Sequence, residues 1–227
     1  MDWLEWAPSD AAIRAEFGYR VEDDRATARL LHALVPPTNR LRDLAPLVRD
    51  RRDVLVLGCG PSLDRLPADA AGPGPVVAAD GATSWMREHG LVPAIVVTDL
   101  DGEPDDLAWA AKAGAAMVVH AHGDNADAVR DLVPMLGPRL YGTYQGPPMP
   151  GLAPLANLGG FTDGDRALLL CEHLGARGAR LEGFDFASQP SKYAHRWDPH
   201  TKPRKLMWAK RVVEGVTQRG RLRLTQP

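Results

Sequence analysis

Two aspartates separated by one residue, Asp99 and Asp101, directly follow an apolar run at residues 94–98. In an extended segment residues two apart point the same way, so both carboxylates can reach one hard cation. Mg²⁺ bound to a triphosphate is the usual use of such a pair, because the ion bridges phosphate oxygens and keeps several waters. We therefore predict that Asp99 and Asp101 bind Mg²⁺ and are catalytic. The alternative is that both acids cap the next helix.

A glycine-rich turn follows an earlier apolar run and contains Gly58, Gly60, Pro61 and Ser62. Glycine allows a tight backbone turn, and proline suits the first position of a helix. Free N–H groups at a helix start can hold phosphate, so we predict that this turn binds the phosphates of a nucleotide. The turn lacks the third glycine of a dinucleotide fingerprint and the Gly-Lys-Ser/Thr of a P-loop, which leaves a plain strand-to-helix turn open.

Polar residues also follow two other apolar runs: Asp80 comes after residues 75–79, and His120, His122, Asp124 and Asn125 come after residues 115–119. The His-x-His-x-Asp spacing is that of a zinc hydrolase, but Asn125 stands where the last histidine of that pattern is expected. Zinc ligation by the two histidines therefore ranks below a structural turn and below contacts to nucleotide or substrate.

The stretch from Gly159 to Arg166 opens a further helix, with Thr162 or Asp163 at its capping position. A glycine pair, the acids Asp163 and Asp165, and an arginine exceed what a cap requires, so we predict that they form part of a site. A basic segment follows later in the chain, and we predict phosphate contacts for its Lys202 and Lys205, with a solvated surface as the alternative.

Elements that position these residues can be placed from apolar runs at residues 53–57, 75–79, 94–98 and 115–119, with weaker runs at 139–141 and 179–182. Because the four main runs are apolar throughout, they predict strands buried on both faces of a parallel sheet. We predict a doubly wound, mainly parallel α/β sheet of the Rossmann-like type, preceded by an N-terminal helical segment broken at Pro36-Pro37. The expected division is a helical segment at residues 1–50 and an α/β domain at residues 51–227.

The chain has 227 residues and a net charge of -2, so no global field attracts nucleic acid or an anionic membrane. Its two cysteines show neither a disulfide framework nor zinc spacing. We saw no secretory signal and no apolar stretch of membrane-spanning length, which predicts a cytoplasmic protein.

Six short motifs of the sequence are Gly-x-Gly-Pro-Ser-Leu, Ala-Asp80-Gly-Ala, Thr-Asp99-Leu-Asp101-Gly, His-Ala-His122-Gly-Asp124-Asn125, Gly-Gly-Phe-Thr-Asp163-Gly-Asp165-Arg166 and Gly-Phe-Asp185-Phe. Taken together, these motifs resemble the archaeal 6-hydroxymethyl-7,8-dihydropterin pyrophosphokinase family in order and spacing over residues 53 to 210. The Asp-Gly and Asp-x-Asp pattern is also similar to that of thiamine pyrophosphokinases. The resemblance implies ATP, Mg²⁺, a reduced pterin substrate and release of AMP, in the synthesis of folate or a tetrahydromethanopterin-type cofactor.

On this interpretation, the pterin hydroxyl attacks the β-phosphorus of ATP while positioning and charge neutralisation lower the barrier. Asp80 and Asn157 are expected to bind the amide and amino edge of the pterin. Phe161 or Phe184 is expected to stack on its ring, unless both belong to the core. The other expected substrate contacts are His122, Asp124, Asn125, Asp163 and Asp165.

Three other functions stay open at this point. An Asp-x-Asp after a strand also suits a metal-dependent nucleotide-sugar glycosyltransferase of the flagellin-modification type, although those proteins are typically larger. A non-catalytic nucleotide-binding module and, more distantly, a zinc hydrolase are the others. The pattern does not decide which pterin cofactor is served, whether the chain forms a homodimer, or which basic residue contacts phosphate.

Overall fold

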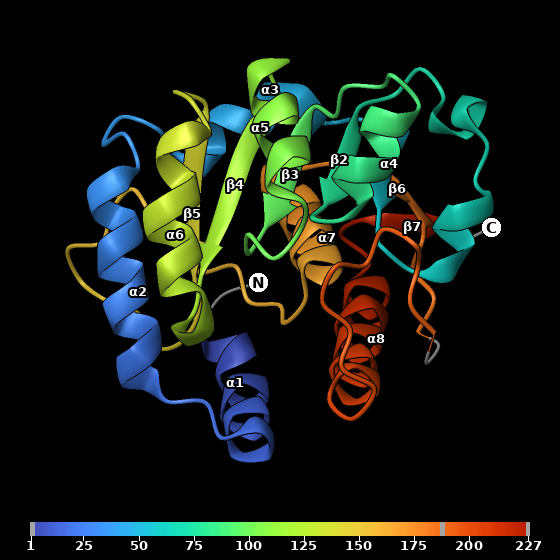
Figure 1. The fold of residues 1–227 in the computed structure, drawn as a ribbon. Helices are drawn as coiled ribbons and strands as arrows, with labels where there is room; N and C mark the ends of the chain where they lie inside the picture. The colour runs from blue at the N-terminus through green and yellow to red at the C-terminus, as the bar shows by residue number, and fades with distance from the viewer. Residues whose placement is uncertain (1–2, 187–188, 226–227) are drawn as a thin grey trace.

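A computed structural model describes residues 3–186 and 189–225 of the chain. The described residues form one seven-stranded sheet in which every pairing is parallel. Its strands lie in the order β5-β4-β3-β2-β1-β6-β7. Figure 1 labels all of them except β1. They are β1 (Val54–Leu57), β2 (Val76–Ala79), β3 (Ile95–Thr98), β4 (Ala116–Ala121), β5 (Leu140–Tyr144), β6 (Gly178–Glu182) and β7 (Arg223–Thr225).

The helices and 3-10 turns are α1 (Trp3–Phe17), α2 (Val21–Leu34), η1 (Leu41–Leu44), α3 (Ala45–Val48), η2 (Pro61–Arg65), η3 (Ala68–Ala71), α4 (Ala82–Glu88), α5 (Pro104–Lys112), η4 (Gly123–Asn125), α6 (Ala126–Leu132), η5 (Val133–Met135), α7 (Asp163–Leu174) and α8 (Lys202–Arg219). Among the described residues, no helix has the length and apolar character needed to cross a bilayer.

Helices cover both faces of the sheet, as a doubly wound fold requires. Val54 and Val56 of β1 pack into one core with residues of α7, α8, α1 and α3. Leu55 and Leu57 of the same strand pack into a core with α4, and β3 and β4 share a further core with α2, α5 and α6. Because neighbouring strand residues point to opposite faces, the uninterrupted apolar runs seen in the sequence are explained by burial on both sides. The predicted fold class is confirmed.

The N-terminal helical segment lies against the sheet. Helix α2 contacts β5, β4 and α6, and Leu31 in α2 is fully buried. Pro36 and Pro37 separate α2 from η1, as the sequence predicted. The division of the chain at residue 50 stays a prediction.

Strand order reverses at β1, which lies between β2 and β6. The chain runs outward from β1 through β5, then returns through α7 to place β6 on the other side of β1. In open parallel sheets, ligands bind beyond the carboxyl ends of the strands at such a reversal. The segments after β1, β2, β3 and β6 therefore frame the expected site.

Candidate functional site

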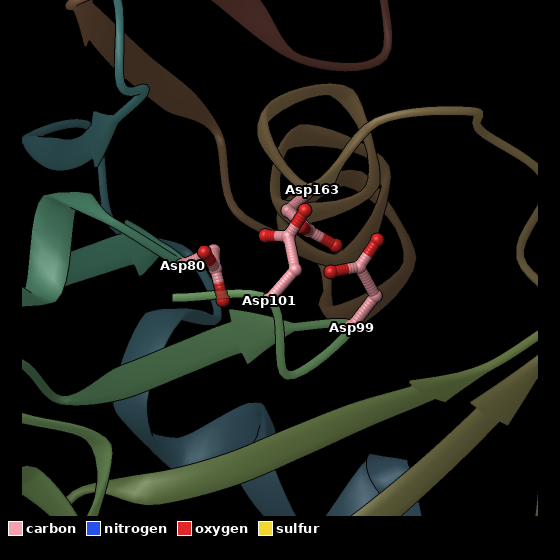
Figure 2. A group of neighbouring side chains, drawn as sticks. All are labelled: Asp80, Asp99, Asp101 and Asp163. Atoms are coloured by element: carbon pink, nitrogen blue, oxygen red, sulfur yellow. The ribbon is translucent and has the colours of Figure 1, made fainter. Parts of the chain in front are cut away.

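Four carboxylates meet at the carboxyl edge of the sheet (Figure 2). One side-chain oxygen from each lies within 4.8 Å of the others, and we call the set the acidic cluster: Asp80, Asp99, Asp101 and Asp163. Asp80 follows β2, the next two follow β3, and Asp163 begins α7. From the sequence we predicted Asp99 and Asp101 as metal ligands and the other two as substrate contacts, whereas the structure brings all four together.

The turn after β3 explains how Asp99 and Asp101 come to the same place. Leu100 between them has φ +71°, so the segment is not extended and the reason given by the spacing is wrong. Thr98 Oγ1 accepts a hydrogen bond from the Leu100 N–H (2.8 Å) and donates one to Asp80 Oδ1 (2.5 Å). A single buried hydroxyl therefore ties the ends of two strands together.

The electrostatics of the acidic cluster are those of crowded, buried acids. Burial and neighbouring carboxylates raise the pKa of Asp80, Asp101 and Asp163. Burial acts in the same direction on Asp99, but the hydrogen bond and charge of His122, with Arg166, outweigh it and hold the pKa of that carboxyl below its ordinary value.

The acidic cluster fits a divalent cation. Asp99 Oδ1 is buried and has no hydrogen-bond partner among the described residues, which is costly for a carboxylate oxygen unless a cation binds it. The donors are all carboxylate oxygens, the ligands preferred by Mg²⁺ and other hard cations.

A cavity opens over the acidic cluster between the sheet edge and α8. Asp80, Asp101 and Asp163 line it, together with aromatic and basic side chains. The lining residues are 58–60, 79–81, Asp101, 162–165, 183–186, Gln189, 193–197, Lys202, Leu206 and Ala209. The cavity thus combines negative charge, positive charge and flat apolar surface.

The glycine turn after β1 lies at this cavity, but the N–H groups of Gly58, Gly60 and Ser62 are used within the chain. The N–H groups of Gly58 and Gly60 donate to the carbonyls of Glu182 and Gly183, both at 2.8 Å. Ser62 donates to Asp185 Oδ2 through its N–H (2.8 Å) and its hydroxyl (2.5 Å).

Pro61 has no N–H, so the free donors on which phosphate binding by this turn was predicted are absent from these four residues. The glycines have a packing role instead, because a Cβ on Gly58 would come within 2.5 Å of the Gly183 carbonyl oxygen.

The two predicted phosphate-binding lysines are separated. Lys202 lines the cavity at the start of α8. Lys205, one turn later, places its Nζ 5.7 Å from the centre of the Phe161 ring and 5.9 Å from that of Tyr19, away from the described lining of the cavity. Of the two lysines, Lys202 is the one that borders the cavity, and a phosphate contact of either stays a prediction.

The turn after β4 supports the acidic cluster. His122 Nδ1 accepts from the Asp124 N–H (3.3 Å), which leaves the proton on Nε2, 3.2 Å from Asp99 Oδ2. Asn125 donates to the carbonyls of Asp99 and His120 (2.7 and 2.8 Å) and accepts from the His122 N–H (3.0 Å). The Asn125 amide is therefore fully used within the chain.

The remaining predicted substrate contacts lie apart from the cavity or have other partners. The Asp124 side chain is exposed and outside the described lining. Asn157 donates to the Gly146 carbonyl (2.7 Å) and accepts from the Gly159 N–H (2.9 Å). Phe161 is buried against Phe17, with ring centres 5.2 Å apart. These contacts give Asn125, Asp124, Asn157 and Phe161 no support as substrate ligands, and their assignment stays a prediction.

Asp165 is a helix cap, although it also borders the cavity. Its carboxylate accepts from the N–H groups of Phe161 and Thr162 and from the Thr162 hydroxyl, at 2.7 to 3.0 Å. Thr162 and Asp165 thus form a capping box at the start of α7, which places Asp163 in the acidic cluster.

Sequence reasoning missed the wall formed by residues 193–197. Tyr193, His195, Arg196 and Trp197 line the same cavity as Asp80, Asp101 and Asp163. The signal was present as an arginine, a histidine and two aromatic rings within five residues, but no strand or helix pattern marked their position. Phe184, the second stacking candidate, also lines the cavity.

The comparisons with known proteins point to one family, and the matches cover most of the chain. A family model described as 6-hydroxymethylpterin diphosphokinase MptE-like matches residues 28–191. A relative from Pyrococcus furiosus is 39% identical over 236 residues, covering 100% of this chain and 99% of its own length. Relatives from Methanothermobacter thermautotrophicus and Methanocaldococcus jannaschii are 36% and 32% identical, covering 98% and 86% of this chain and 97% and 84% of their own lengths. All three are named 6-hydroxymethyl-7,8-dihydropterin pyrophosphokinase.

Proposed function

The chain belongs to the 6-hydroxymethylpterin diphosphokinase MptE-like family, and on that premise we propose that it is an ATP-dependent diphosphotransferase acting on 6-hydroxymethyl-7,8-dihydropterin. The products are AMP and the pterin diphosphate, a precursor of folate or of a tetrahydromethanopterin-type cofactor. The observation that carries this proposal is the acidic cluster, of which Asp80, Asp101 and Asp163 line the cavity. A cytoplasmic location and a homodimer stay predictions.

The acidic cluster would hold Mg²⁺ through Asp99 and Asp101, as predicted, with Asp80 and Asp163 completing the set. When bound, the cation supplies neutralisation of the polyphosphate charge. The chain's own contribution is to keep four acids within 4.8 Å by means of the β2 and β3 turns and the α7 cap.

The polyphosphate of ATP would lie between the acidic cluster and the basic wall of the cavity. We call Lys202, Arg196 and His195, which line the cavity, the basic wall; Arg196 and His195 are exposed. The base of the wall is fixed, because the Ser191 hydroxyl donates to Asp64 (2.5 Å) and the Tyr193 hydroxyl donates to Glu88 (2.8 Å). Cations on an anchored segment suit phosphate oxygens through charge-assisted hydrogen bonds.

The flat ring of the acceptor would lie against the aromatic part of the same cavity. Phe184 and Trp197 line it, and their rings offer the stacking surface that a pterin requires. The acceptor hydroxyl would then attack the β-phosphorus and release its proton to solvent, while the bond from that phosphorus to the α,β-bridging oxygen breaks and AMP departs with that oxygen. Orientation of the two substrates is the main task of the residues, as in other phosphoryl transfers.

The alternatives drawn from the sequence gain no support. The relatives that cover nearly the whole chain carry the pyrophosphokinase name, and nothing in the cavity favours a sugar nucleotide over ATP. Zinc ligation by His120 and His122 is also unsupported, because one ring binds Thr143 and the other faces Asp99.

The direct test is incubation of the purified protein with ATP, Mg²⁺ and 6-hydroxymethyl-7,8-dihydropterin, followed by chromatography of nucleotides and pterins. We expect AMP and pterin diphosphate in equal amounts. ADP with a pterin monophosphate, or ATP left intact while it binds, would refute a diphosphotransferase and would favour a simple kinase or a non-catalytic module.

A further inference from the structure

Asp24 in α2 is a buried acid that joins three parts of the chain. Its side chain is 2% exposed. Oδ1 accepts from the Gly123 N–H (2.7 Å) and from Gln145 Nε2 (3.0 Å), and Oδ2 lies 2.7 Å from Arg14 Nη2. A buried carboxylate is stable only when paired and hydrogen-bonded, so these contacts fix its position.

One contact leads to the acidic cluster through the turn after β4. Gly123 directly follows His122, whose Nε2 lies 3.2 Å from Asp99 Oδ2. The approach of α2 to this turn is close, since a Cβ on Gly123 would come within 2.8 Å of Asp23 Cβ. Asp24 therefore holds the backbone from which His122 reaches the cluster.

A second contact leads to the cluster through Gln145 and Arg166. Arg166 Nη2 donates a hydrogen bond to Gln145 Oε1 (3.5 Å), and Gln145 Nε2 donates one to Asp24. Arg166 is 6% exposed, and its Nη1 lies 3.2 Å from Asp163 Oδ1. The amide of Gln145 thus links Asp24 to the guanidinium that contacts Asp163.

We propose that Asp24 is a positioning residue for the candidate metal site, holding His122 and Arg166, the two partners that face Asp99 and Asp163. The N-terminal helical segment, whose sequence carries no recognisable motif, then forms part of the support of the site. This inference rests on the proposed role of the acidic cluster. It concerns how the cluster is held and adds no residue to the groups that touch substrate.

Direct measurement of metal binding tests the proposal without relying on turnover. Mn²⁺ alone is titrated into the protein at pH 8, and free Mn²⁺ is followed by electron paramagnetic resonance. The variants are Asp24→Asn, which removes the charge at constant shape, and Gln145→Met, which removes the link to Arg166. Asp23→Asn is the matched control, because Asp23 is adjacent in α2 and its side chain is 56% exposed.

We expect Mn²⁺ affinity to fall roughly 10-fold or more in Asp24→Asn and Gln145→Met, as for other partners that orient metal ligands, with no change in the control. Circular dichroism and the melting temperature confirm folding. If Asp24→Asn does not fold, the Mn²⁺ affinity of Gln145→Met tests the proposal, because Gln145 is only half-buried. Wild-type affinity in folded variants would overturn the positioning role and leave the proposed function intact. Absence of Mn²⁺ binding by the unaltered protein would overturn both.

Discussion

At the residue scale, the four acids of the acidic cluster differ in the direction of their pKa shifts. The pKa of Asp99 is lowered by His122 and Arg166, whereas burial raises the pKa of Asp80, Asp101 and Asp163. Without a cation, the cluster retains protons that a cation would displace. Asp99 is therefore the carboxylate best prepared to receive the ion.

Replacing Asp101 by Asn tests the metal role of a residue that lines the cavity. The amide keeps the shape but removes a negative ligand, so we expect AMP formation to fall on the order of 100-fold or more while the fold persists. Initial rates across a Mg²⁺ series and circular dichroism measure both effects. Asp127→Asn, at an exposed acid outside the described lining, is the control, and equal activity of the two variants would count against the assignment.

Replacing Arg196 by Gln tests the basic wall. Loss of a charge-assisted contact of about 1.5 to 3 kcal/mol is expected to raise the KM for ATP roughly 10- to 100-fold. Lys205→Gln should leave that KM nearly unchanged, since Lys205 lies over the Tyr19 and Phe161 rings. Steady-state kinetics at saturating pterin separate the two, and the reverse ranking would show that the lysine, as the sequence predicted, contacts phosphate.

At the element scale, the start of α7 carries both a cap and a cluster ligand. Asp165→Ala removes the acceptor of three hydrogen bonds, so we expect the free energy of unfolding to fall by about 2 kcal/mol. Urea denaturation measures the loss. Asp127→Ala, in the exposed first turn of α6, should cost less than about 0.5 kcal/mol. A comparable loss in both would remove the special role of the capping box.

The strands could be predicted from the sequence where burial on both faces requires an uninterrupted apolar run. Runs such as 54–57 and 76–79 must be apolar on both faces, and they placed the strands within a residue or two. β7 was missed because Arg223–Thr225 is a short edge strand with exposed ends, which needs no such pattern. β5 extends to Tyr144, beyond the run that predicted it.

The partners of each side chain decide how much support the structure gives to a predicted site residue, and the site assignments themselves stay predictions. Asp99 and Asp101 were predicted as metal ligands from their spacing after a strand, whereas the turn through Leu100 is what brings them together. Asn125 and Asn157 have amides that suit a pterin, yet backbone groups occupy them. Such pairings depend on which loops meet in space, and that information is not carried by local sequence.

At the scale of the whole molecule, the reversal of strand order at β1 brings together segments that are far apart in sequence. Residues 58–60, 79–81, 162–165 and 193–197 border one cavity. The basic wall reaches the site because the chain after β6 folds back before α8. Topology, more than any single motif, therefore creates the site.

Metal binding and stability should be linked through pH. Three acids of the cluster have raised pKa values, so the metal-free protein loses stability as pH rises from the ordinary carboxyl range through those folded values. Mg²⁺ binds the deprotonated cluster and offsets this loss. We expect the rise in melting temperature produced by Mg²⁺ over EDTA to be larger at pH 8 than at pH 5. An equal rise at both would separate the cation from these acids.

The most direct test is a crystal structure with Mn²⁺ and a non-hydrolysable ATP analogue, using anomalous scattering to locate the ion. We predict an anomalous peak bound by Asp99 and Asp101, in contact with the polyphosphate, and Arg196 and Lys202 beside the phosphate oxygens. An ion found elsewhere, with these two carboxylates turned toward backbone amides, would contradict the account.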